Sequence, residues 1–354
     1  MTPFSSAPAI GLDIGSSAVR AAQVASAKGG LKLISFAQTA LPPGAVVEGE
    51  IHDAGAVAQA ISALWKRAKI RSKKVVLGIA NQRVIVREVE LPFLEEKDFR
   101  ASLRFQVADH IPMPVDAAEL DYQIIEDYQS DDGRHLMRVL IVAAASDMVE
   151  SFISTAAAAG LRTVGVDLSP FAVARAISAV ARGEVGGAGA EAVVDVGATV
   201  TSIVIHQNGE PRFVRILSLG GDEMTKAVAG DLGLSFEEAE AVKLDIGAGV
   251  AYAEAEQIIL THLDALVGEI RGSLDYFLSQ GHNEAIASVI LAGGGALTPG
   301  LVARLGEALN LEVKLGTALS DMNLGKAKLT SDQAAMADPV AAAAVGLATG
   351  VRAA

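Results

Sequence analysis

Apolar residues along the chain follow two patterns: short apolar or alternating runs typical of strands, and longer stretches with helical spacing. The first part of the chain predicts three successive strands, then a helix and a buried strand, at 10–14, 18–25, 31–40, 53–69 and 75–79. A later part repeats this opening, with three strands followed by helices at 193–196, 201–207, 211–217, 221–232, 235–244 and 254–279. One order of elements that occurs twice predicts an α/β protein with two related lobes.

Between the two series, the pattern predicts a small inserted unit of one strand, one helix and two further strands. Its elements are expected at 84–91, 95–111, 120–127 and 135–143, with prolines 112 and 114 closing the helix. A further helix is expected at 147–159, and a strand at 163–168 and a helix at 170–180 then return the chain to the first lobe. The following segment, 182–190, is rich in glycine and alanine and is the expected hinge.

The last part of the chain predicts a strand at 288–291, a helix from Pro299 and a final helix from Pro339. The resulting domain boundaries are a first lobe at 1–83, an inserted subdomain at 84–162, the rest of the first lobe with the hinge at 163–190, and a second lobe at 191–354 with a helical part at about 222–285.

Composition and charge exclude several classes of function. The chain has 354 residues, 51% of them hydrophobic, which is enough for two sizeable cores, and its formal net charge is −13. We expect no binding to nucleic acid, because neutralising phosphates requires concentrated lysine and arginine. The absence of cysteine excludes disulfides, thiolate metal sites and a cysteine nucleophile, and suits the cytoplasm. No stretch approaches the ~18 apolar residues of a membrane span, so membrane contact is expected to be peripheral or indirect.

Two short turns carry the same candidate chemistry. The first runs from a strand into Asp13, Gly15, Ser16 and Ser17, and the second runs from a strand into Asp195, Gly197 and Thr199. A glycine lets backbone amides approach a phosphate, hydroxyls can donate to its oxygens, and an aspartate can hold a hydrated Mg²⁺. Each turn alone is also compatible with an ordinary hairpin. Together they predict a clamp for one nucleoside triphosphate.

Three further segments are secondary candidates for the same site. Gly293, Gly294 and Gly295 join a strand to a helix, where they either lie against a base or phosphate or form a tight connection. Glu240 and Lys243 share a helix face and either reach a ribose or form a solvated ion pair. The amides of Gly220 and Gly221, where a strand gives way to a helix, either face phosphate or belong to a plain loop.

One basic run stands out in this acidic chain. Six cations fall within nine residues at the end of a predicted helix: Lys66, Arg67, Lys69, Arg71, Lys73 and Lys74. Such a run is most often a solvated helix end whose cations suit the helix dipole. The alternative is a surface for an acidic peptide or an anionic lipid layer.

Taken in order, the turn at Asp13, the turn at Asp195 and the three glycines from Gly293 resemble the actin-like ATPase superfamily, which includes actin, DnaK-type chaperones, sugar kinases and FtsA. The segment from Ala239 to Lys243 looks like the stretch that touches the nucleoside in FtsA-like members. Within the insertion, Leu91-Pro92-Phe93, Ile111-Pro112 and Glu119-Leu120-Asp121-Tyr122 resemble the type IV pilus assembly protein PilM, as does the ending Asp338-Pro339-Val340 through Gly346-Leu347-Ala348. Gln106-Val107 departs from the Glu-Ala that this family more often has.

The resemblance implies an actin-like (ribonuclease H-like) fold with an inserted strand-helix-strand-strand subdomain. It implies an adaptor that binds ATP or ADP with Mg²⁺ and acts on the cytoplasmic side of the inner membrane. Its implied partners are the N-terminal cytoplasmic peptide of a PilN-like membrane protein and other pilus assembly proteins, with self-association left open. The partner groove is expected at 84–91 and 95–111. Mg²⁺ would be held through water by Asp13 and Asp195.

Hydrolysis in this superfamily needs a group that orients water near the γ-phosphate. The segment 161–182, where we seek it, contains neither glutamate nor glutamine, and its only carboxylate is Asp167. We therefore assign no catalytic residue and expect tight nucleotide binding with slow or negligible turnover. Two rival interpretations remain, a small-molecule kinase and a filament-forming protein of the FtsA type. The sequence ends at residues 351–354 with no predicted amphipathic helix after the last lobe helix, which favours the PilM-like interpretation over FtsA.

Overall fold

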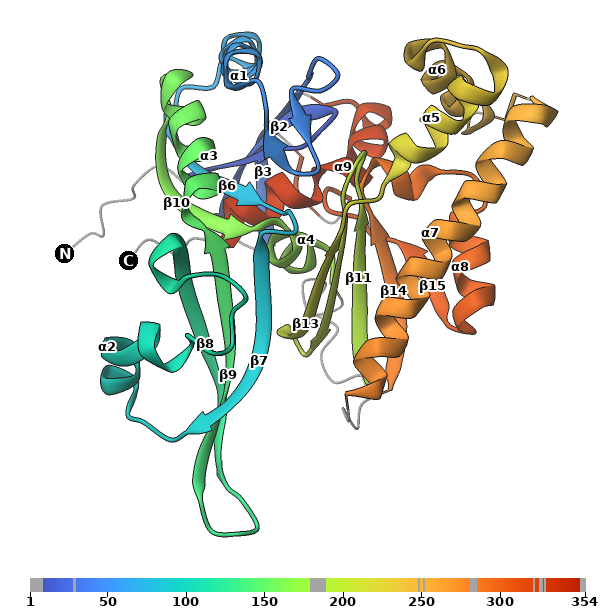
Figure 1. The fold of residues 1–354 in the computed structure, drawn as a ribbon. Coiled ribbons are helices and arrows are strands. Elements are labelled where there is room, and N and C mark those ends of the chain that lie inside the picture. Colours follow the sequence, from blue (N-terminus) through green and yellow to red (C-terminus); the bar gives the residue numbers. More distant parts are fainter. Residues whose placement is uncertain are drawn as a thin grey trace.

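Two five-stranded sheets form the frame of the molecule (Figure 1). The computed structural model describes residues 9–27, 30–178, 189–247, 249–250, 252–280, 285–320, 322–324, 327 and 329–350. The first sheet has the order β10-β6-β1-β2-β3, with β1 at Ile10–Ile14, β2 at Ala18–Ala27, β3 at Gly30–Ala40, β6 at Lys74–Ile79 and β10 at Arg162–Leu168. The second has the order β13-β12-β11-β14-β15, with β11 at Ala190–Val196, β12 at Thr201–Gln207, β13 at Glu210–Leu217, β14 at Ile286–Ala292 and β15 at Glu312–Leu315.

The two sheets share one topology. Strand β1 pairs antiparallel with β2 and parallel with β6, and β11 pairs antiparallel with β12 and parallel with β14. The outer strands extend both sheets in the same way. Strand β3 pairs antiparallel with β2 as β13 does with β12, and β10 pairs parallel with β6 as β15 does with β14. This repetition confirms the predicted two-lobed α/β fold. The sequence pattern did not predict β15, a four-residue strand with only two apolar side chains.

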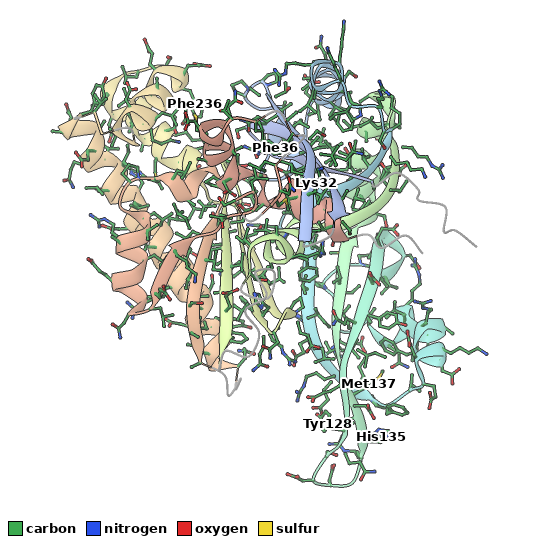
Figure 2. All side chains as sticks on the ribbon, turned by 180° about the vertical axis from the view of Figure 1, so that it is seen from behind. Lys32, Phe36, Tyr128, His135, Met137 and Phe236 are labelled. Carbon is green, nitrogen blue, oxygen red and sulfur yellow. The ribbon has the colours of Figure 1, made fainter. Side chains whose placement is uncertain are left out.

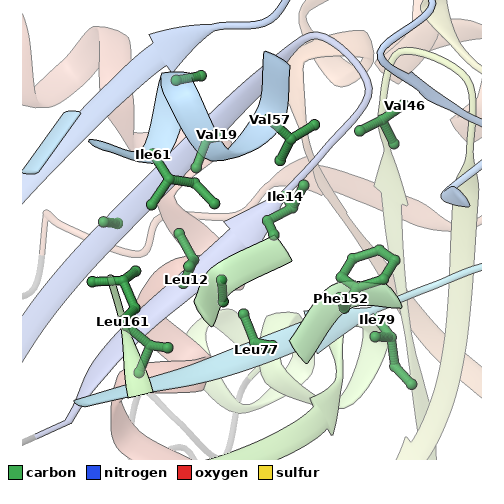
Figure 3. Close-up of a cluster of buried hydrophobic side chains, with 14 of the residues drawn as sticks. Leu12, Ile14, Val19, Val46, Val57, Ile61, Leu77, Ile79, Phe152 and Leu161 are labelled. Atoms are coloured by element: carbon green, nitrogen blue, oxygen red, sulfur yellow. The ribbon is translucent and has the colours of Figure 1, made fainter. Parts of the chain in front are cut away.

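Alternating residues of β1 serve two different layers. Its apolar side chains point into a core beneath α1 (Ala54–Ala68) and α3 (Ser146–Ala158), where Leu12 and Ile14 meet Ile61 of α1 and Phe152 of α3 (Figure 3). Helix α1 begins where predicted, because the Asp53 side chain accepts a hydrogen bond of 2.9 Å from the Ala56 amide. The small hairpin of β4 (Val46–Val47) and β5 (Glu50–Ile51), which was not predicted, closes the edge of this core.

The other face of each sheet covers a pair of helices, α4 (Ser169–Ile177) and α9 (Ser331–Gly350). Small residues let these layers approach closely. A Cβ on Gly346 would lie 1.7 Å from the Ala172 carbonyl oxygen of α4, and one on Gly11 would lie 1.9 Å from the Ala344 carbonyl oxygen of α9. The last helix, α9, thus packs on the first sheet, although the sequence prediction assigned the whole of 191–354 to the second lobe. The domain boundaries themselves stay a prediction.

The insertion extends from the first lobe as a three-stranded antiparallel sheet (Figure 1). Its order is β7-β9-β8, with β7 at Val84–Pro92, β8 at Ala118–Gln129 and β9 at His135–Ala145. Helix α2 (Glu96–Gln106) and the short 3₁₀ helix η1 (Val115–Ala117) accompany it. Strand, helix, strand and strand therefore follow in the predicted order. Helix α3, inside the predicted range 84–162, packs on the first lobe instead.

Helix α2 is shorter than the predicted 95–111. It ends at Gln106, and the following turns bury Val107 and Ile111 in the core of the insertion without helical geometry. The apolar spacing on which the prediction depended is preserved in these turns. Proline disfavours helical backbone at the residue before it, so Pro112 accounts for the non-helical Ile111.

The second lobe carries most of the remaining helices. They are α5 at Gly221–Leu232, α6 at Phe236–Gly247, α7 at Ala253–Ser279, the 3₁₀ helix η2 at Gly294–Leu297, and α8 at Leu301–Leu309. Helix α7 contributes Ile259, Leu263 and Ile270 to the core that also contains apolar residues of β11 and β14. The prediction of a helix from Pro299 was two residues early. Among the described residues, no helix is long and apolar enough to span a membrane.

The prediction of a last helix from Pro339 was wrong at its start. Helix α9 begins at Ser331, and Pro339 lies inside it. A reciprocal cap begins the helix, since the Thr330 amide donates to the Gln333 side chain and the Gln333 amide donates to the Thr330 hydroxyl. Most of the predicted hinge 182–190, and the end of the chain at 351–354, lie outside the described residues.

Candidate functional site

A cavity of about 670 Å³ lies between the two lobes, where the ends of β1 and β11 face each other. Twelve of the fourteen predicted site residues line it: Asp13, Gly15, Ser16, Ser17, Asp195, Gly197, Gly221, Glu240, Lys243, Gly293, Gly294 and Gly295. Thr199 and Gly220 do not line it but lie beside it, through contacts described below. Segments nearly three hundred residues apart in sequence therefore meet in one site.

The two predicted turns have the same construction. The Gly15 amide donates 3.1 Å to the Ala18 carbonyl, and the Gly197 amide donates 2.9 Å to the Val200 carbonyl. Glycine is needed in the second turn, because a Cβ on Gly197 would lie 2.8 Å from the Val200 carbonyl oxygen. The turns touch across the cavity through the hydroxyls of Ser16 and Thr199, whose oxygens are 2.5 Å apart. The hydroxyls predicted to contact the phosphates of one nucleotide therefore face each other.

Asp13 and Asp195 form the acidic centre of the cavity. Burial raises the pKa of Asp13, and Arg20 partly opposes this with a 3.4 Å ion pair. Burial and the charge of Asp13 raise the pKa of Asp195 to about 7. Two neighbouring carboxylates, one of which raises the proton affinity of the other, form a site whose charge a cation would neutralise. No group of three or more metal-ligating side chains occurs among the described residues, so a cation here would complete its coordination with water and phosphate.

The glycines around β14 allow close backbone packing. Gly293 has a φ of +84°, and a Cβ there would lie 2.5 Å from a carboxylate oxygen of Asp195.

The glycines that precede α5 pack against the second turn. A Cβ on Gly220 would lie 2.5 Å from the Ala198 carbonyl oxygen. The amides of Gly221 and Asp222 donate to the carbonyls of Gly197 and Ala198, so these donors are engaged within the protein. The expected contact between the Gly221 amide and phosphate is thus not available in this arrangement.

Glu240 and Lys243 form an ion pair with each other at 2.6 Å. Lys243 is only 12% exposed, and it also donates to the Thr225 hydroxyl and the Gly221 carbonyl. Thr225 in turn donates to Glu240. The pair is therefore neither a solvated surface pair nor free to turn, and it presents one carboxylate and one ammonium group to the cavity from α6.

Several residues that line the cavity were not predicted from the sequence. Arg20 lies on β2 seven residues after Asp13, and the antiparallel pairing of β1 with β2 places the two residues directly opposite. An arginine beside Asp13 was detectable from that hairpin register. Three largely exposed apolar side chains also line the mouth: Leu244, Leu297 and Met336, which are 64%, 49% and 79% exposed. Met336 was missed because the first turns of α9 were missed.

Asp167, the only carboxylate of 161–182, does not line the cavity. Its side chain accepts two hydrogen bonds from Arg175, at 3.0 and 2.9 Å, and a third from the Leu168 amide. The Arg175 guanidinium also donates to the Gly346 carbonyl of α9. Asp167 therefore connects β10, α4 and α9, and it is not positioned to orient water in the cavity.

Comparison with known proteins places this geometry in a family. The family model described as type IV pilus assembly protein PilM matches residues 11–351. A solved structure named PilM-PilN type IV pilus biogenesis complex is 28% identical, covers 97% of this chain and 98% of its own, and gives a TM-score of 0.85. The structure of MreB 5 of Spiroplasma citri bound to AMPPNP is 14% identical, covers 88% and 92%, and gives a TM-score of 0.51, which is a likeness of fold.

The cell division protein FtsA of Streptococcus pneumoniae serotype 2 is 24% identical over 345 residues, which are 86% of this chain and 74% of the relative. The two-lobed fold is thus an actin-like fold. Because the family model spans nearly the whole sequence, the chain belongs to the family of the type IV pilus assembly protein PilM.

Proposed function

We propose that this chain is a nucleotide-binding adaptor of a type IV pilus assembly complex on the cytoplasmic side of the inner membrane. In this proposal it binds the N-terminal cytoplasmic peptide of a PilN-like membrane protein and reaches the membrane through that partner. The observation that carries the proposal is the 0.85 TM-score over 97% of the chain with a protein solved as a PilM-PilN complex. Other pilus assembly proteins are the remaining partners that we expect.

The cavity fits a nucleoside triphosphate with Mg²⁺. Its volume of about 670 Å³ lies within the range of small-molecule sites, and its acidic centre carries two carboxylates that a divalent cation would neutralise. Asp13 and Asp195 would hold the hydrated cation. The phosphate contacts would come from Ser16, Ser17, Gly197 and Thr199, and the nucleoside contacts from Gly294, Gly295, Glu240 and Lys243. Arg20 would meet the phosphates as a cation.

The nucleotide would act as a latch between the lobes. The Ser16 and Thr199 hydroxyls belong to different lobes and lie 2.5 Å apart, so a phosphate bound by both turns would join β1 to β11. Binding to one closed arrangement favours that arrangement over an open one. The engagement of Asp167 with Arg175 supports slow turnover, because the carboxylate sought for water orientation is held elsewhere.

The partner peptide would bind along the insertion. Helix α2 presents Phe105 with 84% of its surface exposed, an unusual position for a large aromatic side chain. Strand β7 is an edge of the inserted sheet and lies near β13 of the second lobe. An exposed apolar anchor on α2 and a strand edge on β7 are each features that suit a short extended peptide.

The test is a calorimetric titration of MgATP into the wild-type protein and into Thr199→Lys. We expect the lysine to fill the space between the two turns and to lower nucleotide affinity at least tenfold. Thr261→Lys, at an exposed position of α7, is the matched control and is expected to bind MgATP like the wild type. Unchanged affinity in Thr199→Lys would show that the second turn is structural only.

A filament-forming protein of the FtsA type is the second candidate function. The 24% identity with FtsA across 86% of the chain favours it. Light scattering of the protein with MgATP and no partner distinguishes the two. Polymer formation under these conditions would support the filament, whereas a constant signal together with peptide binding supports the adaptor.

A further inference from the structure

A second hollow, of about 830 Å³, lies at the opposite end of the first sheet from the cleft. We call it the basic hollow. It is lined by Gln23, Ile34, Ser35, Ala68, Lys69, Ile70, Arg71, Ser72, Lys73, Lys74 and Ala327. Strand β6 begins here, with Val75 beside Ile10, whereas β1 ends at the Asp13 turn. The basic run singled out in the sequence therefore borders a concave surface that the nucleotide and peptide sites do not use.

The backbone of the basic hollow is fixed. Lys69 ends α1 in the left-handed region with a φ of +54°, and the Ile70 amide donates 3.1 Å to the Trp65 carbonyl. The buried Trp65 donates its indole N–H to the Ser72 carbonyl at 2.9 Å. On the far side, the Arg162 amide donates 2.7 Å to the Lys73 carbonyl. The four cations thus project from a held segment, and all four are exposed.

The charge around the basic hollow opposes that of the whole chain. The lining of the basic hollow contains four lysines and arginines and no aspartate or glutamate, in a chain with 29 basic and 42 acidic residues. None of Lys69, Arg71, Lys73 and Lys74 forms an ion pair with any carboxylate of the described ranges. Lys32, labelled in Figure 2, precedes the lining residue Ile34 on β3 by two positions. Unneutralised cations crowded at one site gain most from a multivalent anion.

We infer that the basic hollow binds the phosphate-bearing headgroups of acidic phospholipids and docks this end of the first lobe directly on an anionic membrane. Three of the four cations are lysines, which bind phosphate as mobile point charges, and the hydroxyls of Ser35 and Ser72 lie among them as further donors. A headgroup-sized hollow with a cationic rim receives phosphates from several lipids at once. This contact is independent of the nucleotide cleft and of the peptide partner, so it goes beyond the adaptor function.

An acidic peptide suits the basic hollow less well. Peptides bound to a sheet add to its edge or insert apolar anchors into pockets. Here the lining side chains Ile34 and Ile70 are partly covered, and the cations come from the segment between α1 and β6 rather than from the edge strand β3. The experiment below includes the peptide as a competing outcome.

The test is vesicle co-sedimentation of the full chain. Vesicles of phosphatidylcholine with about one third phosphatidylglycerol are compared with pure phosphatidylcholine at low salt. The four-site variant carries Lys69→Gln, Arg71→Gln, Lys73→Gln and Lys74→Gln. The matched control removes four exposed cations elsewhere, through Lys97→Gln, Arg134→Gln, Lys226→Gln and Arg271→Gln, so both variants reach the same net charge of −13 − 4 = −17.

We expect the wild type and the control to bind the anionic vesicles and neither of them to bind pure phosphatidylcholine. The four-site variant should bind the anionic vesicles at least about tenfold more weakly, since each cation near an anionic surface contributes separately to the binding free energy. Raising the salt concentration is expected to release the wild type. Equal loss in both variants would overturn the inference, because net charge alone would then explain binding. Equal binding to uncharged vesicles would also overturn it.

Two further titrations separate the sources of anion. Inorganic phosphate and a glutamate-rich peptide are each titrated calorimetrically into the wild type and the four-site variant. The membrane inference is overturned if the wild type binds phosphate or the peptide but no vesicles, and the four-site variant loses that binding. The ligand would then be a soluble anion or an acidic protein. Matching circular dichroism spectra and unfolding temperatures verify that the variants are folded.

Discussion

Replacing the buried carboxylate of Asp195 by an amide should stabilise the protein while it weakens cation binding. In the folded chain, burial and the charge of Asp13 raise the pKa of Asp195 from 3.8 to about 7. The folded protein therefore holds this proton more tightly than the unfolded chain does. Between about pH 4 and pH 7, unfolding releases the proton, so this group makes stability fall as the pH rises. Asp195→Asn cannot titrate and removes this dependence.

The magnitude follows from the size of the shift. A shift of about three pKa units corresponds to roughly 4 kcal/mol above pH 7, and water that reaches the cavity reduces this to about 2 kcal/mol. With an unfolding entropy of about 2.1 cal/mol/K per residue, that difference raises the unfolding temperature by roughly 3 °C. The gain should be largest near pH 8 and shrink toward pH 5.

The assay is thermal unfolding of wild type and Asp195→Asn across this pH range without nucleotide or divalent cation. Asp231→Asn, at an exposed carboxylate of α5, is the matched control and should show no change. At pH 8, added MgATP should raise the unfolding temperature of the wild type more than that of Asp195→Asn. A variant that is less stable than the wild type at pH 8 would refute the reasoning, because the carboxylate would then be favourably solvated or paired.

Three other substitutions test the fold, the cleft and the partner surface. Gly346→Ala should cost about 3 kcal/mol of unfolding free energy, because the new methyl group would lie 1.7 Å from the Ala172 carbonyl oxygen. The control Gly230→Ala has open space around it and should be neutral or stabilising. Chemical denaturation compares the two variants, and equal midpoints would contradict the packing of α4 on α9. Thr199→Lys should abolish the rise in unfolding temperature that MgATP gives the wild type, and a retained rise would remove the second turn from the site. Phe105→Ser should change the unfolding free energy by no more than about 0.5 kcal/mol, because this side chain is 84% exposed. It should nevertheless weaken binding of the PilN-like peptide about tenfold in calorimetry. Leu278→Ser on α7 is the control, and unchanged peptide affinity in Phe105→Ser would exclude α2 from the groove.

Much of the fold follows from local patterns. The strands β1 and β12 and the helix α5 have the predicted bounds, since each combines a clear period with a turn or cap at its ends. Errors occurred where two local signals conflict. Helix α9 contains Pro339, a residue that usually begins or breaks a helix, whereas the cap formed by Thr330 and Gln333 begins the helix earlier.

The candidate site was predictable as a set of turns but not as a set of contacts. Glycines and aspartates mark the ends of β1, β11 and β14, so their meeting follows from the fold. Sequence spacing cannot reveal that the amides of Gly221 and Asp222 are engaged by backbone carbonyls. Nor does it reveal that Met336 reaches the mouth, because this depends on how α9 passes between the sheets.

The most direct test of the central claim is a calorimetric titration of the N-terminal cytoplasmic peptide of the PilN-like membrane protein, with and without MgATP. The account predicts saturable binding of one peptide per chain, tighter when the nucleotide closes the two lobes on each other. It also predicts that Thr199→Lys binds the peptide with the affinity of the nucleotide-free wild type, whether or not MgATP is present. No peptide binding in either condition would contradict the adaptor function, and identical affinity in both conditions would contradict the latch.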